Sequence, residues 1–132
     1  MLTYAWIAAG GAIGTMLRFW LNLFFTGRFG ETMPWGTILI NITGSFAIGL
    51  FAALSEPGGR LPLSTDVRLF VLVGLCGGYT TFSSFSLQTL ALVQAGDPGR
   101  AIANVMLSVF CCLIAVWLGF ATPIAFSRLF RS

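Results

Sequence analysis

A run of ten residues from position 77 to 86 carries most of the chemistry that this sequence offers. It reads Gly-Gly-Tyr-Thr-Thr-Phe-Ser-Ser-Phe-Ser and lies inside an apolar segment without charged residues. Backbone N–H and C=O groups cannot stay unpaired in lipid. A glycine- and hydroxyl-rich interruption is therefore tolerated at membrane depth only where protein or a water-filled cavity surrounds it. The run is a candidate ion or substrate site.

Neutral hydrogen-bond donors are the functional groups that this run shares with two other apolar segments. Asn41 falls on one helix face with Thr37, Gly44 and Ser45. Its amide could donate to a passing ligand, or it could bond a neighbouring helix and serve only in packing, which the spacing alone favours. The other candidate donors are the hydroxyls of Thr80, Thr81, Ser83, Ser84, Ser86 and Ser108.

Two phenylalanine rings stand beside these donors. Phe82 and Phe85 are three residues apart, which on its own indicates ordinary packing. The serines on the same helix favour a functional interpretation, because the edges of aromatic rings carry partial positive charge. Donors and ring edges without a nearby negative charge suit a small anion, whereas carbonyls freed by a broken helix suit a hard cation such as Na⁺. The residues thus predict a small-anion pathway without naming the anion.

The charged residues exclude several function classes. The four acids, Glu31, Glu56, Asp66 and Asp97, lie in predicted loops, and the chain has no lysine or histidine. Proton-coupled transport normally needs a titratable group at membrane depth. No nucleophile–base pair or metal-ligand spacing indicates an enzyme, and the seven arginines are scattered, which argues against a nucleic-acid partner.

Four apolar spans must position these groups. The chain has 132 residues, of which 57% are hydrophobic and only 8% charged, and a membrane-spanning helix needs roughly 20 apolar residues. We expect an all-α integral membrane protein with four transmembrane helices, the third broken at mid-membrane, in a single domain over residues 1–132. The helices are predicted at about 4–25, 35–54, 69–94 and 101–126. The first span is too long for a signal peptide and lacks its basic flank.

Arg18 is the only charged residue inside a predicted span. Its guanidinium could reach the interface along the aliphatic stem, or it could face a water-filled vestibule. Trp20, an interfacial residue type, favours the vestibule.

Small residues inside the spans predict close packing. Gly10 and Gly14 stand at GxxxG spacing, which lets two helices approach closely. Cys76, Cys111 and Cys112 are odd in number and lie within apolar segments. They are therefore expected to be small packing residues, not a disulfide framework.

The distribution of arginines bears on orientation. With four helices, both termini and the loop at 55–67 lie on one side of the membrane. That side carries Arg60, Arg68, Arg128 and Arg131, and the other carries Arg18, Arg28 and Arg100. The positive-inside rule predicts orientation from such a difference in basic residues, and here the difference is small. So weak a bias permits insertion in both directions, and hence an antiparallel dimer.

Three of the four spans resemble a known family, in order and spacing. The run at 77–86 is similar to the signature of the Fluc (CrcB-type) fluoride channels, residues 36–46 resemble their second-helix motif, and residues 11–19 resemble their first. The resemblance implies an antiparallel, dual-topology homodimer in the bacterial inner membrane. Its two pores would let fluoride leave the cytoplasm passively and so relieve fluoride toxicity. The implied partners are fluoride, membrane lipid and a second copy of the chain.

The resemblance also assigns roles by position. Phe82 and Phe85 match the pore phenylalanines, Asn41 the pore asparagine, and Arg18 the first-helix arginine near the vestibule. Ser83, Ser84 and Ser86 match the hydroxyl track beside the rings, and Ser108 keeps a hydroxyl in the fourth-helix part of the pore wall. Gly77 and Thr80 match the residues whose backbone carbonyls, from both subunits, hold a structural Na⁺ at the dimer centre.

Some positions depart from the family pattern, and other functions stay open. Relatives commonly carry glutamate where this chain has Gln88, and in the fourth helix Asn104 and Cys112 replace a tyrosine of some relatives and a pore-lining serine. A small dual-topology multidrug exporter has the same helix count and similar length, but it needs a membrane-embedded glutamate. If all the polar residues were packing contacts, the chain would be an assembly protein without transport.

Overall fold

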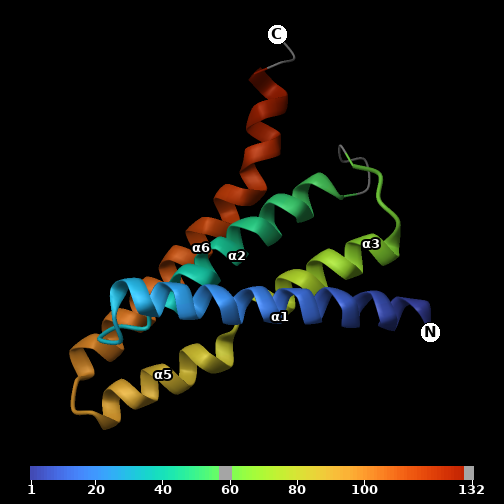
Figure 1. The fold of residues 1–132 in the computed structure, drawn as a ribbon. Coiled ribbons are helices and arrows are strands. Elements are labelled where there is room, and N and C mark those ends of the chain that lie inside the picture. Colours follow the sequence, from blue (N-terminus) through green and yellow to red (C-terminus); the bar gives the residue numbers. More distant parts are fainter. Residues whose placement is uncertain (57–60, 130–132) are drawn as a thin grey trace.

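A computed structural model describes residues 1–56 and 61–129 of the protein. All regular secondary structure in these residues is helical. Within these residues four helical segments are long and apolar enough to cross a membrane. They are α1 (Leu2–Phe29), α2 (Trp35–Leu54), a third segment over Thr65–Gln94, and α6 (Pro98–Leu129). This confirms the prediction of an all-α protein with four potential membrane spans (Figure 1).

The third segment consists of four short pieces. It begins with α3 (Thr65–Leu69), continues as the π-helix η1 (Phe70–Cys76) and the single turn α4 (Gly77–Tyr79), and resumes as α5 (Phe82–Gln94). π-Helical turns are rare and are frequently found at functional sites. The chain then passes from α4 into α5 through a short non-helical link (Figure 1).

Three of the predicted helices extend beyond their predicted ends, whereas α2 has the predicted bounds. Hydropathy marks only the part of a helix that suits lipid, and backbone hydrogen bonding continues into the polar flanks. Local caps define the true starts. The Ser64 hydroxyl accepts from Val67 N–H at 3.4 Å at the start of α3. The Asp97 carboxylate accepts from Arg100 N–H at 3.1 Å at the start of α6, just before Pro98.

The expectation that all four acids lie in loops is wrong for Asp66. It belongs to the first turn of α3, where its negative charge interacts favourably with the helix dipole. The Thr3 hydroxyl donates to its carboxylate at 2.9 Å and so joins the starts of α1 and α3. Arg60 and Arg131, used in the orientation argument, lie outside the described residues, as does the side chain of Arg128.

Glycines allow the helices to pack backbone to backbone. A Cβ added to Gly10 or Gly14 of α1 would collide with the carbonyl oxygens of Phe70 and Leu75 in η1, as the GxxxG spacing predicts. On the other side of the molecule, α2 runs along α6. A Cβ added to Gly49 of α2 would collide with a backbone carbonyl of α6, and a Cβ added to Gly119 of α6 would collide with one of α2. These contacts fix two helix pairs, α1 with η1–α4 and α2 with α6.

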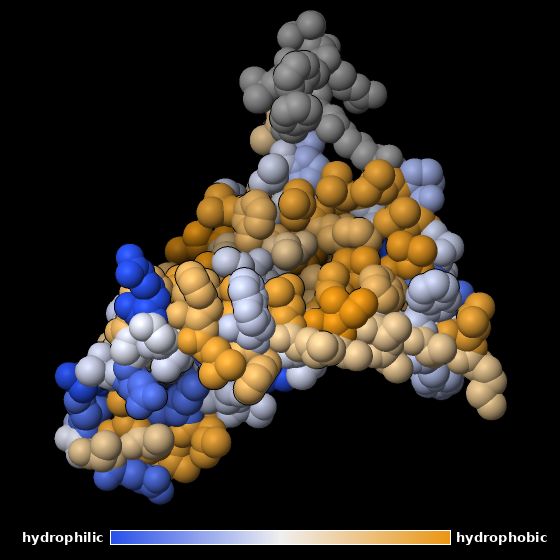
Figure 2. All heavy atoms as spheres, viewed as in Figure 1, coloured by the Kyte–Doolittle hydropathy of each residue, from blue (hydrophilic) through white to orange (hydrophobic). Residues whose placement is uncertain are grey.

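The surface is apolar over most of its visible face. Hydrophobic side chains cover the middle of the molecule in Figure 2, and hydrophilic residues gather at the end where α1 stops and α5 turns into α6. Such an apolar surface suits a lipid environment, because lipid needs no polar covering.

Candidate functional site

The link between α4 and α5 consists of two threonines in extended conformation. Thr80 has φ −83° and ψ 159°, and Thr81 has φ −153° and ψ 112°. β-Branched side chains favour such extended backbone. The Thr81 hydroxyl then accepts from Ser84 N–H at 3.2 Å and caps α5. The sequence therefore ends one helix and starts another within two residues.

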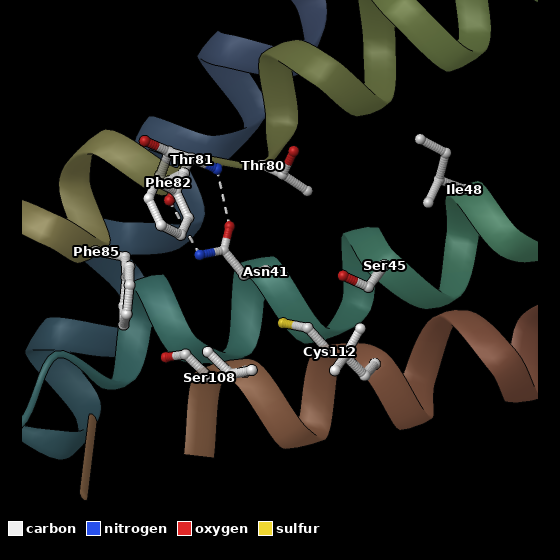
Figure 3. A pocket seen from close by; sticks show the side chains of 11 residues that line it. Asn41, Ser45, Ile48, Thr80, Thr81, Phe82, Phe85, Ser108 and Cys112 are labelled. Carbon is white, nitrogen blue, oxygen red and sulfur yellow. Dashed lines mark hydrogen bonds between the residues drawn. The ribbon is translucent and has the colours of Figure 1, made fainter. Parts of the chain in front are cut away.

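Asn41 of α2 holds this link on both of its backbone groups. Its Oδ1 accepts from Thr81 N–H at 2.8 Å, and its Nδ2 donates to the Thr81 carbonyl at 3.1 Å (Figure 3). This is the packing role that its spacing favours. An amide nitrogen carries two hydrogens, and these bonds use only one of them. The other N–H can donate to a ligand, so the two interpretations of Asn41 are compatible.

The interruption also frees backbone carbonyls. In a continuous helix the Gly77 carbonyl would accept from Thr81 N–H and the Thr80 carbonyl from Ser84 N–H. Those N–H groups instead donate to Asn41 and to the Thr81 hydroxyl. The Gly78 carbonyl, freed in the same way, accepts from Nε of Arg18 at 3.1 Å. Gly77 and Thr80 are thus left with carbonyl oxygens that have lost their helical partners.

A cavity of about 320 Å³ opens beside Asn41. α2, the link, α5 and α6 all contribute to its wall (Figure 3). It brings together four of the predicted pore residues, Asn41, Phe82, Phe85 and Ser108, and none of the acidic or basic side chains that the structure describes lines it. Ser45, Thr80 and Cys112 also line it. The lining offers hydrogen-bond donors and ring edges without fixed charge, as an anion requires.

The two phenylalanines have different environments. Their ring centroids are 5.2 Å apart, with ring planes inclined at 49°. Phe85 is buried, with 7% of its surface exposed, whereas Phe82 is 76% exposed. Phe85 is therefore held by contacts within the chain, whereas most of the Phe82 side chain is left exposed.

The three predicted serines of α5 do not line this cavity. Ser84 accepts from the Thr81 hydroxyl at 3.0 Å and lines a second cavity. Ser83 is exposed, with its Oγ 3.3 Å from that of Thr81. Ser86 is exposed and donates to the Phe82 carbonyl at 2.9 Å. Their pore role remains a prediction.

The second cavity, of about 230 Å³, lies between α1, α2 and α5. Arg18 is half-buried in its wall together with Asn22, Thr37 and Gln88. The guanidinium thus points to the Gly78 carbonyl inside the protein. Gln88 has a buried Oε1 without a hydrogen-bond partner among the described residues.

The sequence did not predict a chain of hydrogen bonds that links α6 to the Phe85 carbonyl of α5. The Ser108 hydroxyl donates to Oδ1 of Asn104 at 3.4 Å, and the Asn104 amide donates to the Thr89 hydroxyl at 2.8 Å. Thr89 in turn donates to the Phe85 carbonyl at 2.8 Å. Asn104 is 1% exposed. The four-residue spacing of Asn104 and Ser108 was the available signal, but sequence could not identify Thr89 as the partner.

These features define a multi-pass α-helical membrane protein with a charge-free, donor-lined cavity beside an interrupted helix. The chain belongs to the family described as CrcB-like protein, Camphor Resistance (CrcB), whose family model matches residues 5–120. This confirms the resemblance found in the sequence.

Curated relatives support the same assignment along nearly the whole chain. A protein of Rhodospirillum rubrum is 58% identical over 118 residues, which cover 89% of this chain and 92% of the relative. A protein of Paramagnetospirillum magneticum is 52% identical over 97% of this chain and 100% of its own length. One of Methylocella silvestris is 49% identical over 97% of this chain and 98% of its own length. Each of the three is named fluoride-specific ion channel FluC.

Proposed function

We propose that this protein is a fluoride-selective channel that lets fluoride leave the cytoplasm passively across the bacterial inner membrane. The names of its relatives support this proposal. The main supporting observation is the cavity lined by the Asn41 amide and the Phe85 ring, whose wall contains no acidic or basic side chain from residues 1–56 and 61–129. A small anion that leaves water needs hydrogen-bond donors at close range, and a nearby carboxylate would repel it.

In this proposal the anion is held by the groups that the cavity leaves available. The second N–H of the Asn41 amide donates to it, while the edges of Phe82 and Phe85 present partial positive charge. Arg18 attracts anions into the second cavity, which serves as the vestibule. The hydroxyls of Ser83, Ser84 and Ser86 form a track beside the rings, and Ser108 continues it on α6. To donate to the anion, Ser86 and Ser108 must first release the bonds that they make to the Phe82 carbonyl and to Asn104.

We further propose that the channel is an antiparallel, dual-topology homodimer with two pores. The exposure of Phe82 supports this, because a second copy could cover the 76% of its surface that one chain leaves open. The interruption at Thr80 and Thr81 would then lie at mid-membrane, near the dimer centre.

A structural Na⁺ fits the freed carbonyls of Gly77 and Thr80. Na⁺ is a hard cation that prefers oxygen ligands, and unwound transmembrane backbone commonly supplies them. These two carbonyls have lost the N–H groups that a continuous helix would give them. When bound, the ion would neutralise their partial negative charges. The two residues of each subunit would hold it.

Fluoride efflux from proteoliposomes, followed with a fluoride electrode, tests the proposal. We expect rapid fluoride efflux and negligible chloride efflux from vesicles loaded with either ion. Equal rates for the two ions, or no fluoride efflux, would refute it. A multidrug exporter would instead use a membrane-embedded glutamate, whereas Glu31 and Glu56 both lie outside the helices of this chain.

A further inference from the structure

Several hydroxyl groups in the spanning helices donate to the backbone of their own helix. Thr43 donates to the Leu39 carbonyl at 2.8 Å, and Thr122 donates to the Leu118 carbonyl at 2.7 Å. This bond satisfies the hydroxyl in an apolar environment. A hydroxyl engaged in this way has no proton left for a ligand, because it carries only one.

Most hydroxyls around the cavity beside Asn41 are engaged too. Thr80 donates to the Cys76 carbonyl at 3.0 Å, and Thr81 donates to the Ser84 hydroxyl at 3.0 Å. Ser108 donates to Asn104 at 3.4 Å, the longest bond of the three. These protons are all committed within the protein.

Ser45 is the exception. It is half-buried, it lines the cavity, and within residues 1–56 and 61–129 its hydroxyl makes no hydrogen bond to an oxygen or a nitrogen. The polar group beside it is the thiol of Cys112 on α6 (Figure 3). A thiol sulfur is a weak acceptor, so it competes poorly with an anion for the Ser45 proton.

Ser45 also stands next to the other available donor. It follows Asn41 by four residues on α2, about 6 Å along the helix axis, and both side chains line the same cavity. An anion in this cavity therefore meets both donors on the same wall. We propose that the Ser45 hydroxyl is a second fluoride-binding donor that acts together with the Asn41 amide. This inference rests on the proposed channel function.

Three substitutions at Ser45 distinguish the effect of the hydroxyl on transport from the effect of side-chain volume. Ser45→Ala removes the donor, Ser45→Cys keeps similar volume with a weak donor, and Ser45→Thr keeps a hydroxyl. Thr122→Ala is the matched control, because it removes an exposed, backbone-bonded hydroxyl outside the cavity. Fluoride efflux from proteoliposomes is measured over a range of fluoride concentrations, and thermal unfolding in detergent is measured for every variant.

We expect Ser45→Ala and Ser45→Cys to lower efflux at low fluoride by about tenfold, the loss that one hydrogen bond to an ion typically produces. Their half-saturating fluoride concentration should rise, while Ser45→Thr and Thr122→Ala stay near the parent. If Ser45→Ala yields no folded protein, Ser45→Cys decides. Parent-like efflux by Ser45→Cys, or a loss in Ser45→Thr equal to that in Ser45→Cys, would overturn this inference alone. A parent chain that carries no fluoride would overturn the proposed function as well.

Discussion

Replacing Asn41 with alanine should loosen the link between α4 and α5. The substitution removes two hydrogen bonds, of 2.8 and 3.1 Å, and leaves the N–H and C=O of Thr81 without partners. Single interhelical hydrogen bonds in membranes contribute about 0.6 kcal/mol on average and up to about 1.7 kcal/mol. Two such bonds contribute between about 1.2 and 3.4 kcal/mol, and for this half-buried side chain we expect a loss within that range, about 2 kcal/mol. That free energy corresponds to roughly 30-fold in the equilibrium for opening the link.

Hydrogen exchange measures this opening directly. Mass spectrometry of a peptide spanning residues 77–86 should show exchange of the Thr81 amide accelerated roughly 30-fold by Asn41→Ala. Thr122→Ala serves as the control, because its hydroxyl bonds only its own helix. Unchanged exchange at Thr81 would show that Asn41 does not hold the link. The same variant should lose fluoride efflux, because it also lacks the donor.

Further substitutions test the packing and the rings. Phe85→Ala should destabilise the protein by about 3 kcal/mol in detergent unfolding, because the ring is buried. Phe82→Ile should lower fluoride efflux at a smaller cost in stability, since Phe82 is 76% exposed. Gly14→Leu should abolish the folded peak in size-exclusion chromatography, whereas Gly11→Ala should not, because a Cβ at Gly11 meets no atom within 4 Å. Asp97→Ala should cost about 1 kcal/mol through loss of the α6 cap, with efflux unchanged.

Much of the fold follows from hydropathy and small residues. The four spans are visible in the sequence because lipid demands long apolar helices. The GxxxG pair Gly10 and Gly14 indicates one of the two close helix pairs. The π-helix η1 before the link has no comparable signal in the sequence, because hydropathy does not distinguish a π-helical turn from an α-helical one. The helix starts at Ser64 and Asp97 were missed because caps lie in polar flanks that hydropathy assigns to loops.

The candidate site was only partly predictable. The types of Asn41, Phe85 and Ser108 indicate donors and a ring, and the structure does bring them to one cavity. Ser45 shares the helix face of Asn41, but whether its proton is free depends on contacts from α6 that spacing cannot give. The same holds for the chain from Ser108 to Thr89, which forms only when α5 and α6 pack together.

The most direct test of a fluoride-selective pore is the ratio of fluoride to chloride efflux in one preparation of proteoliposomes. Vesicles loaded with both salts, with protein-free vesicles as the baseline, would be followed with two ion-selective electrodes. We expect fluoride to leave rapidly while chloride stays at the baseline, because the cavity beside Asn41 offers close donors to a small anion. Chloride leaving as fast as fluoride, or fluoride remaining at the baseline, would contradict it.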